Sequence, residues 1–215
     1  MLPPLANGSA AAGRKPYVVP VGGSNALGTW GYLLAAGELR EQAAAEGIEV
    51  TDVVLATGSG GTAAGLALGA RLAAESAGEQ APAITAYAVC DTEEYFYDFC
   101  QGLLDELAGA EAGYKSRELM AVRDAKGKGY AVATDEELET VRAVAAATGV
   151  LLDPVYSGKA LHGMLADMRA DPDRWRGRKV VFLHTGGLFG MMDDSKLGQL
   201  LPLVGGVSRF ADFAK

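Results

Sequence analysis

The sequence predicts an α/β fold with three layers, in which helices cover both faces of a parallel β-sheet. Two observations predict it: short runs of aliphatic and β-branched residues end at glycines or acidic residues, and stretches with the composition of helices follow them. Strands that alternate with helices form parallel sheets, which bind ligands beyond the carboxyl ends of their strands. The chain has 215 residues, 49% of them hydrophobic, so it has enough apolar side chains for one sizeable core.

The predicted strands all end at residues that interrupt a strand. The first, residues 17–21, stops at two glycines, and the second, residues 53–56, runs into a glycine-rich turn. The third, residues 84–89, ends at a cysteine and an aspartate. The fourth, residues 180–183, is broken by the turn at residues 184–187. We expect these ends to meet at one ligand crevice, because the carboxyl ends of parallel strands share an edge of the sheet.

The predicted helices are recognised by composition and by their caps. Ser24 and Asn25 are candidate N-caps of the first helix. Thr134 and Glu137 form a capping box for the fourth, which Gly149 ends. The five helices cover approximately residues 28–46, 63–75, 93–107, 134–147 and 159–169.

The glycine-rich turn after the second strand is a candidate anion site. It consists of Gly58, Ser59, Gly60, Gly61 and Thr62. Glycines let the backbone approach a ligand, successive N–H groups point into such a bend, and the following helix adds a partial positive charge. A phosphate there would meet backbone amides and the hydroxyls of Ser59 and Thr62.

The same turn differs from the common nucleotide-binding loops. A P-loop has a lysine after its last glycine, whereas Thr62 is followed here by two alanines. A dinucleotide-binding turn requires an acidic residue at the end of the next strand, and Asp91 is available for that role, so a nicotinamide enzyme stays an alternative. A small monophosphate fits the turn better.

Composition argues against two classes of partner. The net charge is −8 and no cluster of Lys and Arg occurs, whereas nucleic-acid binding requires clustered cations. No stretch approaches the roughly 20 apolar residues that span a bilayer, so we expect a soluble protein that does not bind a membrane. Cys90 and Cys100 have no spacing signature, and we expect them to be free thiols. His162 and His184 are isolated, and we expect structural roles for both and no metal site.

Residues 1–15, rich in Pro, Gly, Ala and Ser, have the composition of a disordered leader, and residues 16–215 form the predicted domain. The leader lacks acidic residues and ends in Arg14 and Lys15, as a transit peptide does, but it equally fits the exposed end of a piece of a longer chain. The location therefore stays open between the cytoplasm and an organelle, either the mitochondrion or the plastid.

Six ordered motifs resemble one enzyme family. They are PVGGSNALGTWGY (20–32), GSGGTAAGL (58–66), YFYDFCQGLLD (95–105), AKGKGYA (125–131), LLDPVYSGKA (151–160) and FLHTGG (182–187). Together they resemble the family of D-cysteine desulfhydrase and 1-aminocyclopropane-1-carboxylate deaminase, and its plant and algal members most of all. These are pyridoxal-phosphate enzymes with the tryptophan synthase β-like fold. The resemblance extends from Tyr17 to about Met191.

The resemblance implies roles for particular residues. The backbone amides of residues 58–62 would hold the phosphate of pyridoxal 5'-phosphate, in agreement with the anion site inferred from the turn itself. Tyr156 and Tyr130 would stand close to the substrate as catalytic residues, where a phenol hydrogen-bonds an amino acid or moves a proton. From the residues alone, a packed aromatic ring is the alternative for each. Ser157 and Thr185 would offer hydroxyls to the cofactor near its pyridine nitrogen.

The implied activity is β-elimination from D-cysteine, a small amino-acid substrate, with release of sulfide, ammonia and pyruvate. Ser157 follows Tyr156 at the position where the deaminase branch has a glutamate facing the pyridine nitrogen. A hydroxyl does not keep that nitrogen protonated, and this difference favours the desulfhydrase over the deaminase. Two alternatives stay open: 1-aminocyclopropane-1-carboxylate deamination and a non-catalytic domain that binds a phosphate ligand.

The resemblance also implies that the chain matches only the later part of such an enzyme, namely the large domain. The family's cofactor-binding lysine lies near its chain start, in a stretch that has no counterpart here. We therefore expect this chain alone to be inactive. The family is usually dimeric, so the resemblance implies a homodimer for the full-length form.

Overall fold

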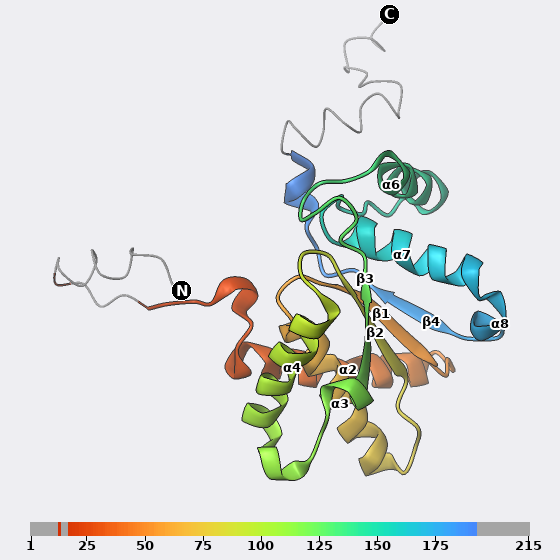
Figure 1. Cartoon of the computed structure of the whole chain (residues 1–215). Helices are drawn as coiled ribbons and strands as arrows, with labels where there is room; N and C mark the ends of the chain where they lie inside the picture. Colours follow the sequence, from red (N-terminus) through yellow and green to blue (C-terminus); the bar gives the residue numbers. More distant parts are fainter. Residues whose placement is uncertain (1–12, 14–16, 193–215) are drawn as a thin grey trace, which may run out of the picture.

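Four parallel strands form the central sheet of the protein, in the order β3–β2–β1–β4 (Figure 1). The structure is a computed structural model that describes Gly13 and residues 17–192. The strands are β1 (Asp52–Thr57), β2 (Ala83–Ala88), β3 (Met120–Asp124) and β4 (Val180–Leu183). β1 lies between β2 and β4, so the glycine-rich turn that follows it leaves the sheet from an inner strand.

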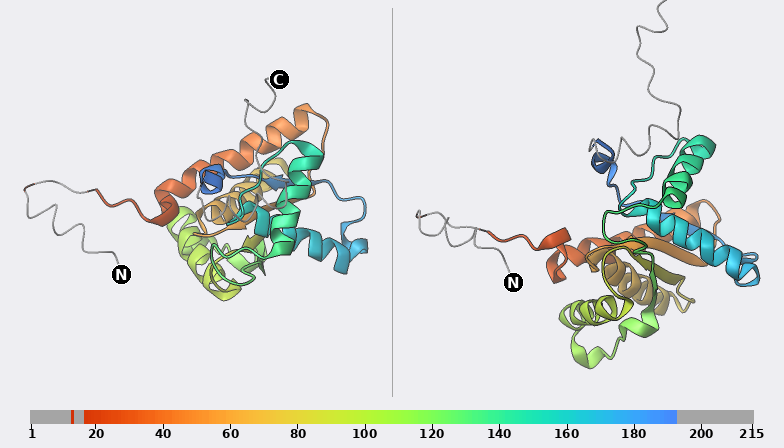
Figure 2. Two further views of the ribbon diagram at one scale, coloured as in Figure 1. Left: turned by 90° about the horizontal axis from the view of Figure 1, so that it is seen from above. Right: turned by 45° about the horizontal axis from the view of Figure 1, so that its top comes forward.

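Helices cover both faces of this sheet. The longer ones are α2 (Ala26–Ala45), α3 (Gly61–Ala77), α4 (Glu93–Ala108), α6 (Asp135–Thr148) and α7 (Ser157–Ala170). The shorter ones are η1 (Val21–Gly23), η2 (Ala110–Ala112), α5 (Ser116–Leu119), α8 (Pro172–Trp175) and η3 (Leu188–Met192). α2, α3 and α4 lie on one side of the sheet, and α7 with α6 and α8 lies on the other (Figures 1 and 2). The predicted three-layer α/β fold is confirmed.

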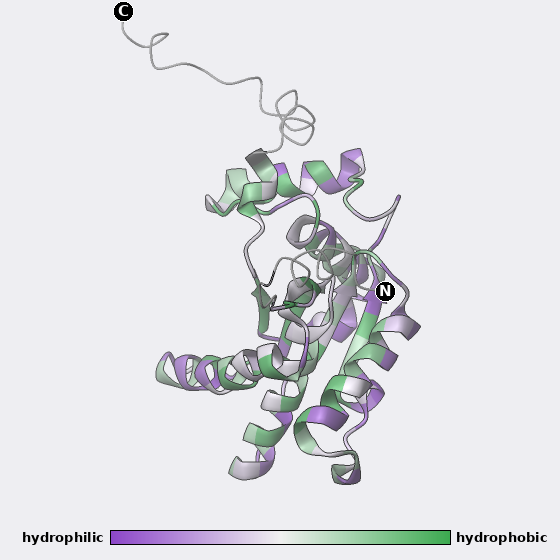
Figure 3. Cartoon of the chain, turned by 90° about the vertical axis from the view of Figure 1, so that its left-hand side faces the viewer, coloured by the Kyte–Doolittle hydropathy of each residue, from purple (hydrophilic) through white to green (hydrophobic). Residues whose placement is uncertain are grey.

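The side chains of β1 explain the two-sided covering. Val53 and Leu55 pack into the cluster formed with α2 and α3, whereas Val54 packs into a second cluster with α7. Successive side chains of a strand point to opposite faces, so a strand buried on both faces requires an uninterrupted apolar run. Most of the helices carry both hydrophobic and hydrophilic bands in Figure 3, whereas α3 is buried on all sides from Ala63 to Gly69.

Most predicted elements are confirmed. β1, β2 and β4 match three predicted strands, and the five longer helices match the five predicted helices. The capping box of Thr134 and Glu137 is present, and Gly149 ends α6 in the left-handed conformation. β3 was not predicted, because its sequence MAVRD has only three apolar residues before two charged ones.

The predicted strand at residues 17–21 is wrong. Residues 17–20 have no regular structure, and Val21 begins the short helix η1. Tyr17 and Val21 are exposed, so the apolar composition that suggested a buried strand belongs to a surface segment. Pro20 lacks a backbone donor, and Gly22 adopts a left-handed conformation that turns the chain away from an extended path. The predicted leader, residues 1–15, lies outside the described residues apart from Gly13.

The close approach of α2 and α3 depends on a glycine. A Cβ atom at Gly69 in α3 would lie 2.7 Å from the carbonyl oxygen of Leu33 and 2.8 Å from the Cβ of Ala36, both in α2. By contrast, a Cβ atom at Gly31 in α2 would meet no other atom within 4 Å.

We expect Gly69→Ala to lower the free energy of unfolding by about 1–3 kcal/mol, because the added methyl group forces the two helices apart. Gly31→Ala is the matched control, and it should raise the free energy of unfolding by up to about 1 kcal/mol, because alanine favours a helix interior. Urea denaturation followed by circular dichroism measures both changes. Equal effects of the two substitutions would show that the contact between the helices is not tight.

Candidate functional site

The segments that follow the four strands gather at one edge of the sheet (Figure 1). All four strands are parallel, so their carboxyl ends and the turns that leave them share this edge. The glycine-rich turn follows β1, residues 89–92 follow β2, residues 125–134 follow β3, and residues 184–187 follow β4. The N-terminus of α7 joins them at residues 153–157, because Tyr156 contacts the glycine-rich turn.

The glycine-rich turn presents backbone donors at the N-terminus of α3. Within the described part of the chain, the amides of Ser59, Gly60 and Thr62 have no hydrogen-bond partner. The amide of Gly61 donates to Oγ of Ser24 over 3.1 Å, and Ser24 Oγ donates to Ser59 Oγ over 2.8 Å. Ser59 therefore keeps its own hydroxyl hydrogen for a ligand. Three unpaired amides and two hydroxyls at the start of a 17-residue helix match the donors that a phosphate requires.

Ser24 was expected as a helix cap, in a segment whose end was expected to reach the same ligand crevice as the glycine-rich turn. In the structure the cap is Asn25, whose side chain accepts a hydrogen bond from the amide of Gly28. Ser24 instead joins the glycine-rich turn from 35 residues away in the sequence. No local pattern in the sequence signals a contact of this range.

Tyr156 stands directly against the glycine-rich turn. A Cβ atom at Gly58 would lie 2.7 Å from Cε1 of Tyr156, so only glycine leaves room for the ring. The hydroxyl of Tyr156 lies 2.5 Å from that of Tyr130, and the two rings meet edge to face. Burial, together with this hydrogen bond, raises the pKa of Tyr156 well above its usual range. Tyr156 is therefore a protonated phenol at neutral pH, next to the predicted phosphate site.

A buried carboxylate fixes the backbone that carries Tyr156. Asp153 accepts hydrogen bonds from the amides of Val155, Tyr156 and Ser157, each over 2.8 Å. It also accepts one from the hydroxyl of Ser157 over 2.7 Å. The carboxylate lies at the N-terminus of α7, where the helix dipole favours a negative charge. From the sequence, Asp153 is recognised only as part of the motif at residues 151–160, and this role is not predicted.

Ser157 and Thr185 lie in different surroundings. Ser157 is buried, and its hydroxyl both donates to Asp153 and accepts from the Asp153 amide over 2.9 Å. Thr185 is exposed, in the loop after β4. His184 holds that loop, because its Nε2 donates to the carbonyl of Leu151 and its Nδ1 accepts from the amide of Gly186. No contact among the described residues joins Thr185 to Ser157, and the cofactor roles of both stay predictions.

The other candidate groups have structural partners. Cys90 Sγ donates to the carbonyl of Gly58 over 3.2 Å, and burial, with the nearby Asp91, raises the pKa of its thiol. Nδ1 of His162 donates to the hydroxyl of Thr140. The described residues contain no group of His, Cys, Asp and Glu side chains suited to a metal ion. None of the described helices is long and apolar enough to cross a membrane.

The comparisons with known proteins give the family of the chain. The family model described as "Pyridoxal-phosphate dependent enzyme" matches residues 5–186. The chain is 52% identical, over 199 residues, to the mitochondrial bifunctional D-cysteine desulfhydrase/1-aminocyclopropane-1-carboxylate deaminase of Arabidopsis thaliana, covering 92% of this chain and 47% of that protein. It is 38% identical, over 182 residues, to a putative 1-aminocyclopropane-1-carboxylate deaminase of Pyrococcus furiosus, covering 83% and 52%.

A solved structure shows the same fold. The crystal structure of an ACC deaminase homologue superposes with a TM-score of 0.74 at 34% identity, over 91% of this chain and 57% of that one. The fold is thus the tryptophan synthase β-like fold that the sequence predicts. The chain spans about half the length of the curated relatives it matches. The matched residues include the glycine-rich turn and Tyr156, and the chain belongs to the family of pyridoxal-phosphate dependent enzymes.

Proposed function

We propose that this chain supplies the cofactor-phosphate site and two catalytic tyrosines of a D-cysteine desulfhydrase. The reaction converts D-cysteine and water into pyruvate, sulfide and ammonia. The observation that carries the proposal is the placement of the Tyr156 phenol against the glycine-rich turn, within 2.5 Å of the Tyr130 phenol. This arrangement brings a proton-carrying group next to donors suited to a phosphate.

Pyridoxal 5'-phosphate, when bound, supplies an electron sink for the carbanion that forms when the α-proton of an amino acid is removed. The amides of Ser59, Gly60 and Thr62 would hold its phosphate, together with the hydroxyls of Ser59 and Thr62. Ser157 and Thr185 are the proposed hydroxyl contacts to the ring. The site needs no Lys or Arg for the phosphate, because backbone N–H groups and a helix N-terminus supply the positive potential.

The tyrosine pair suits a proton transfer to the leaving group. Tyr156 keeps its proton at neutral pH, because burial and the hydrogen bond to Tyr130 raise its pKa. The sulfur that leaves the β-carbon carries developing negative charge, and a neutral phenol within reach can donate a hydrogen bond or a proton to it. Tyr130, which is 52% exposed, connects Tyr156 to solvent and so offers a route for its reprotonation.

A second candidate function is 1-aminocyclopropane-1-carboxylate deamination, which the name of the Arabidopsis relative includes. Ser157 favours the desulfhydrase. Its hydroxyl hydrogen is directed at Asp153, so Ser157 brings no negative charge to a pyridine nitrogen. Elimination of sulfide from the β-carbon requires less carbanion stabilisation than opening a cyclopropane ring does.

The proposal extends to the substrate, the oligomeric state and the location of the protein. We expect a small amino acid as substrate and a homodimer as the state of a longer form. Leu27, Trp30 and Leu34 are exposed on one face of α2, which supports a further protein surface over that helix. The Arabidopsis relative is named as mitochondrial, which supports an organelle over the cytoplasm for this protein.

Ser59→Ala and Thr62→Ala should each weaken binding of pyridoxal 5'-phosphate by about tenfold to a hundredfold, because each removes a hydrogen bond to a charged group worth about 1.5–3 kcal/mol. Absorbance titration of the purified chain measures the affinity. Thr148→Ala is the matched control, because that hydroxyl donates to the carbonyl of Val144 within α6 and accepts from the amide of Val150 just beyond it. Pyridoxal, which lacks the phosphate, should bind all variants equally. Equal affinities of all variants for pyridoxal 5'-phosphate would contradict the proposed phosphate site.

Tyr156→Phe should lower sulfide release from D-cysteine by about a hundredfold to ten-thousandfold, the usual contribution of a general acid. The assay requires a fusion that places this chain behind the part of the Arabidopsis relative that it does not match. Tyr17→Phe is the control, since Tyr17 is exposed. Undiminished sulfide release by Tyr156→Phe would rule out the proton-donor role. Formation of 2-oxobutanoate from 1-aminocyclopropane-1-carboxylate by the same fusion tests the second candidate function.

The chain alone, supplied with pyridoxal 5'-phosphate and D-cysteine, should release no sulfide. Borohydride reduction should not attach the cofactor stoichiometrically to any one lysine. Lys159, the lysine in the motif beside Tyr156, is fully buried and its nitrogen is already engaged by Glu137 and two backbone carbonyls. Borohydride reduction followed by peptide mass analysis checks this expectation. Stoichiometric labelling of one lysine, with turnover of D-cysteine, would show that a complete catalytic site is present.

A further inference from the structure

Lys159 is a buried ammonium group close to the tyrosine pair. It lies in the first turn of α7, three residues after Tyr156, and its side chain is completely buried. Its Nζ atom donates to the carbonyl of Lys126 over 3.0 Å and to the carbonyl of Val132 over 2.8 Å. Glu137 provides two further acceptors at 3.2 and 3.0 Å. An ammonium group has three N–H donors, so these acceptors use all of them.

The two carbonyls belong to the loop that carries Tyr130. This loop, residues 125–134, joins β3 to α6. Lys159 binds it four residues before Tyr130 and two residues after it. Ala131, between Tyr130 and Val132, has a φ angle of 59°, which is a disfavoured conformation for a residue with a Cβ atom. Such a conformation persists only where the surrounding structure fixes it, and the bond from Lys159 to Val132 is one such constraint.

Glu137 ties the same ion pair to the end of the loop. Its Oε2 atom accepts from the amide of Thr134 over 2.7 Å and so forms half of the capping box of α6. The Glu137 side chain is only 7% exposed. Lys159 therefore contacts the start of the loop, its end and the helix that follows it, all from one atom of α7.

We propose that Lys159 is a positioning residue, which holds the loop of residues 125–134 on α7 and thereby sets the contact between the Tyr130 and Tyr156 hydroxyls. Tyr156 and Lys159 belong to the same turn of α7, so one helix end holds both members of the tyrosine pair in register. The consequence for catalysis rests on the proposed function, but the loop geometry does not.

The test compares variants of the 215-residue chain in the absence of cofactor. Lys159→Met removes the three donors. Lys159→Met alone leaves the Glu137 carboxylate buried without its partner. The double variant Glu137→Gln/Lys159→Met removes that carboxylate as well, which avoids the cost of an unpaired buried charge. Tyr130→Phe supplies the reference for a broken tyrosine contact, and Lys179→Met is the control at an exposed lysine. Urea denaturation measures the stability of each variant.

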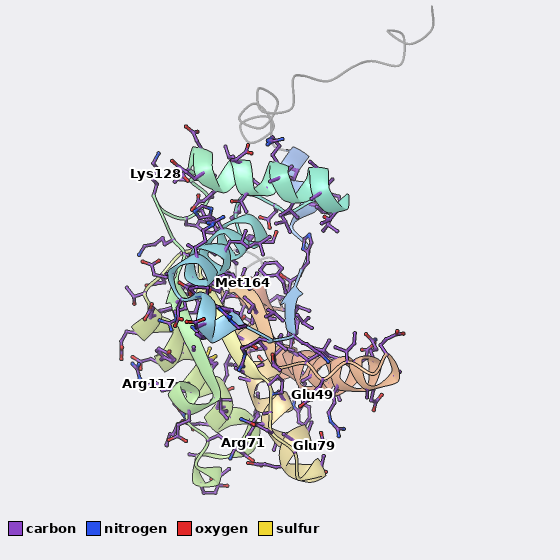
Figure 4. The ribbon with its side chains drawn as sticks, turned by 90° about the vertical axis from the view of Figure 1, so that its right-hand side faces the viewer. Glu49, Arg71, Glu79, Arg117, Lys128 and Met164 are labelled. Carbon is purple, nitrogen blue, oxygen red and sulfur yellow. The ribbon has the colours of Figure 1, made fainter. Side chains whose placement is uncertain are left out.

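Two measurements report on the loop itself. The first is the rate of trypsin cleavage after Lys128, which lies at the periphery of the molecule on this loop (Figure 4). The second is the nuclear magnetic resonance signal of Tyr156 in protein labelled with ¹³C at the tyrosine Cζ, assigned with Tyr156→Phe. The Tyr156 resonance distinguishes a positioning role from a purely structural one, because it reports the environment of the phenol and not the stability of the fold.

We expect the double variant to regain most of the stability that Lys159→Met loses and still to be cleaved on the order of tenfold faster than the parent chain, because two hydrogen bonds that close the loop are absent. Its Tyr156 signal should move to the position seen in Tyr130→Phe. Lys179→Met should match the parent in both measurements. A stable double variant with the parent's cleavage rate and Tyr156 signal would overturn the proposal, whatever the chain's activity proves to be.

Discussion

The carboxylate of Asp153 is the interaction on which the candidate site depends. It gathers three backbone amides and one hydroxyl at the N-terminus of α7, and this turn of backbone carries Tyr156 to the glycine-rich turn of β1. The carboxylate is almost completely buried, so its hydrogen bonds are made in a medium of low dielectric constant, where charged hydrogen bonds are strong and unpaired donors are costly. Loss of Asp153 would free the Tyr156 backbone.

The two tyrosines reach each other from separate elements, and a different charged group holds each one. Asp153 fixes Tyr156 on α7, whereas the Lys159 ammonium fixes the loop that carries Tyr130. Both charged groups belong to the segment of residues 153–159. Two oppositely charged anchors, one just before α7 and one in its first turn, therefore hold two phenols 2.5 Å apart. The donors of the glycine-rich turn lie between β1 and the first turn of α3, and Tyr156 packs against that turn at Gly58.

Local patterns in the sequence predicted the parts of the molecule that local forces decide. The apolar run of β1, the glycine-rich turn and the capping box of Thr134 and Glu137 each result from interactions between neighbours in the chain, and the structure contains all of them. The individual bonds of Ser24 and Lys159 were not predicted, because their partners lie 22 to 37 residues away in the sequence. Residues 17–21 were mistaken for a strand because an apolar surface segment has the same composition as a buried one.

The effect of residue 157 on substrate preference depends on its neighbour Asp153. The resemblance places a glutamate of the deaminase branch at this position, but the Ser157 side chain is buried against the Asp153 carboxylate. A glutamate here would put two carboxylates side by side in a buried site, where one must take up a proton or move away. It would also remove the hydroxyl that donates to Asp153 and accepts from its amide. A change of activity at this position therefore requires a matching change around Asp153, which links substrate preference to the same carboxylate that positions Tyr156.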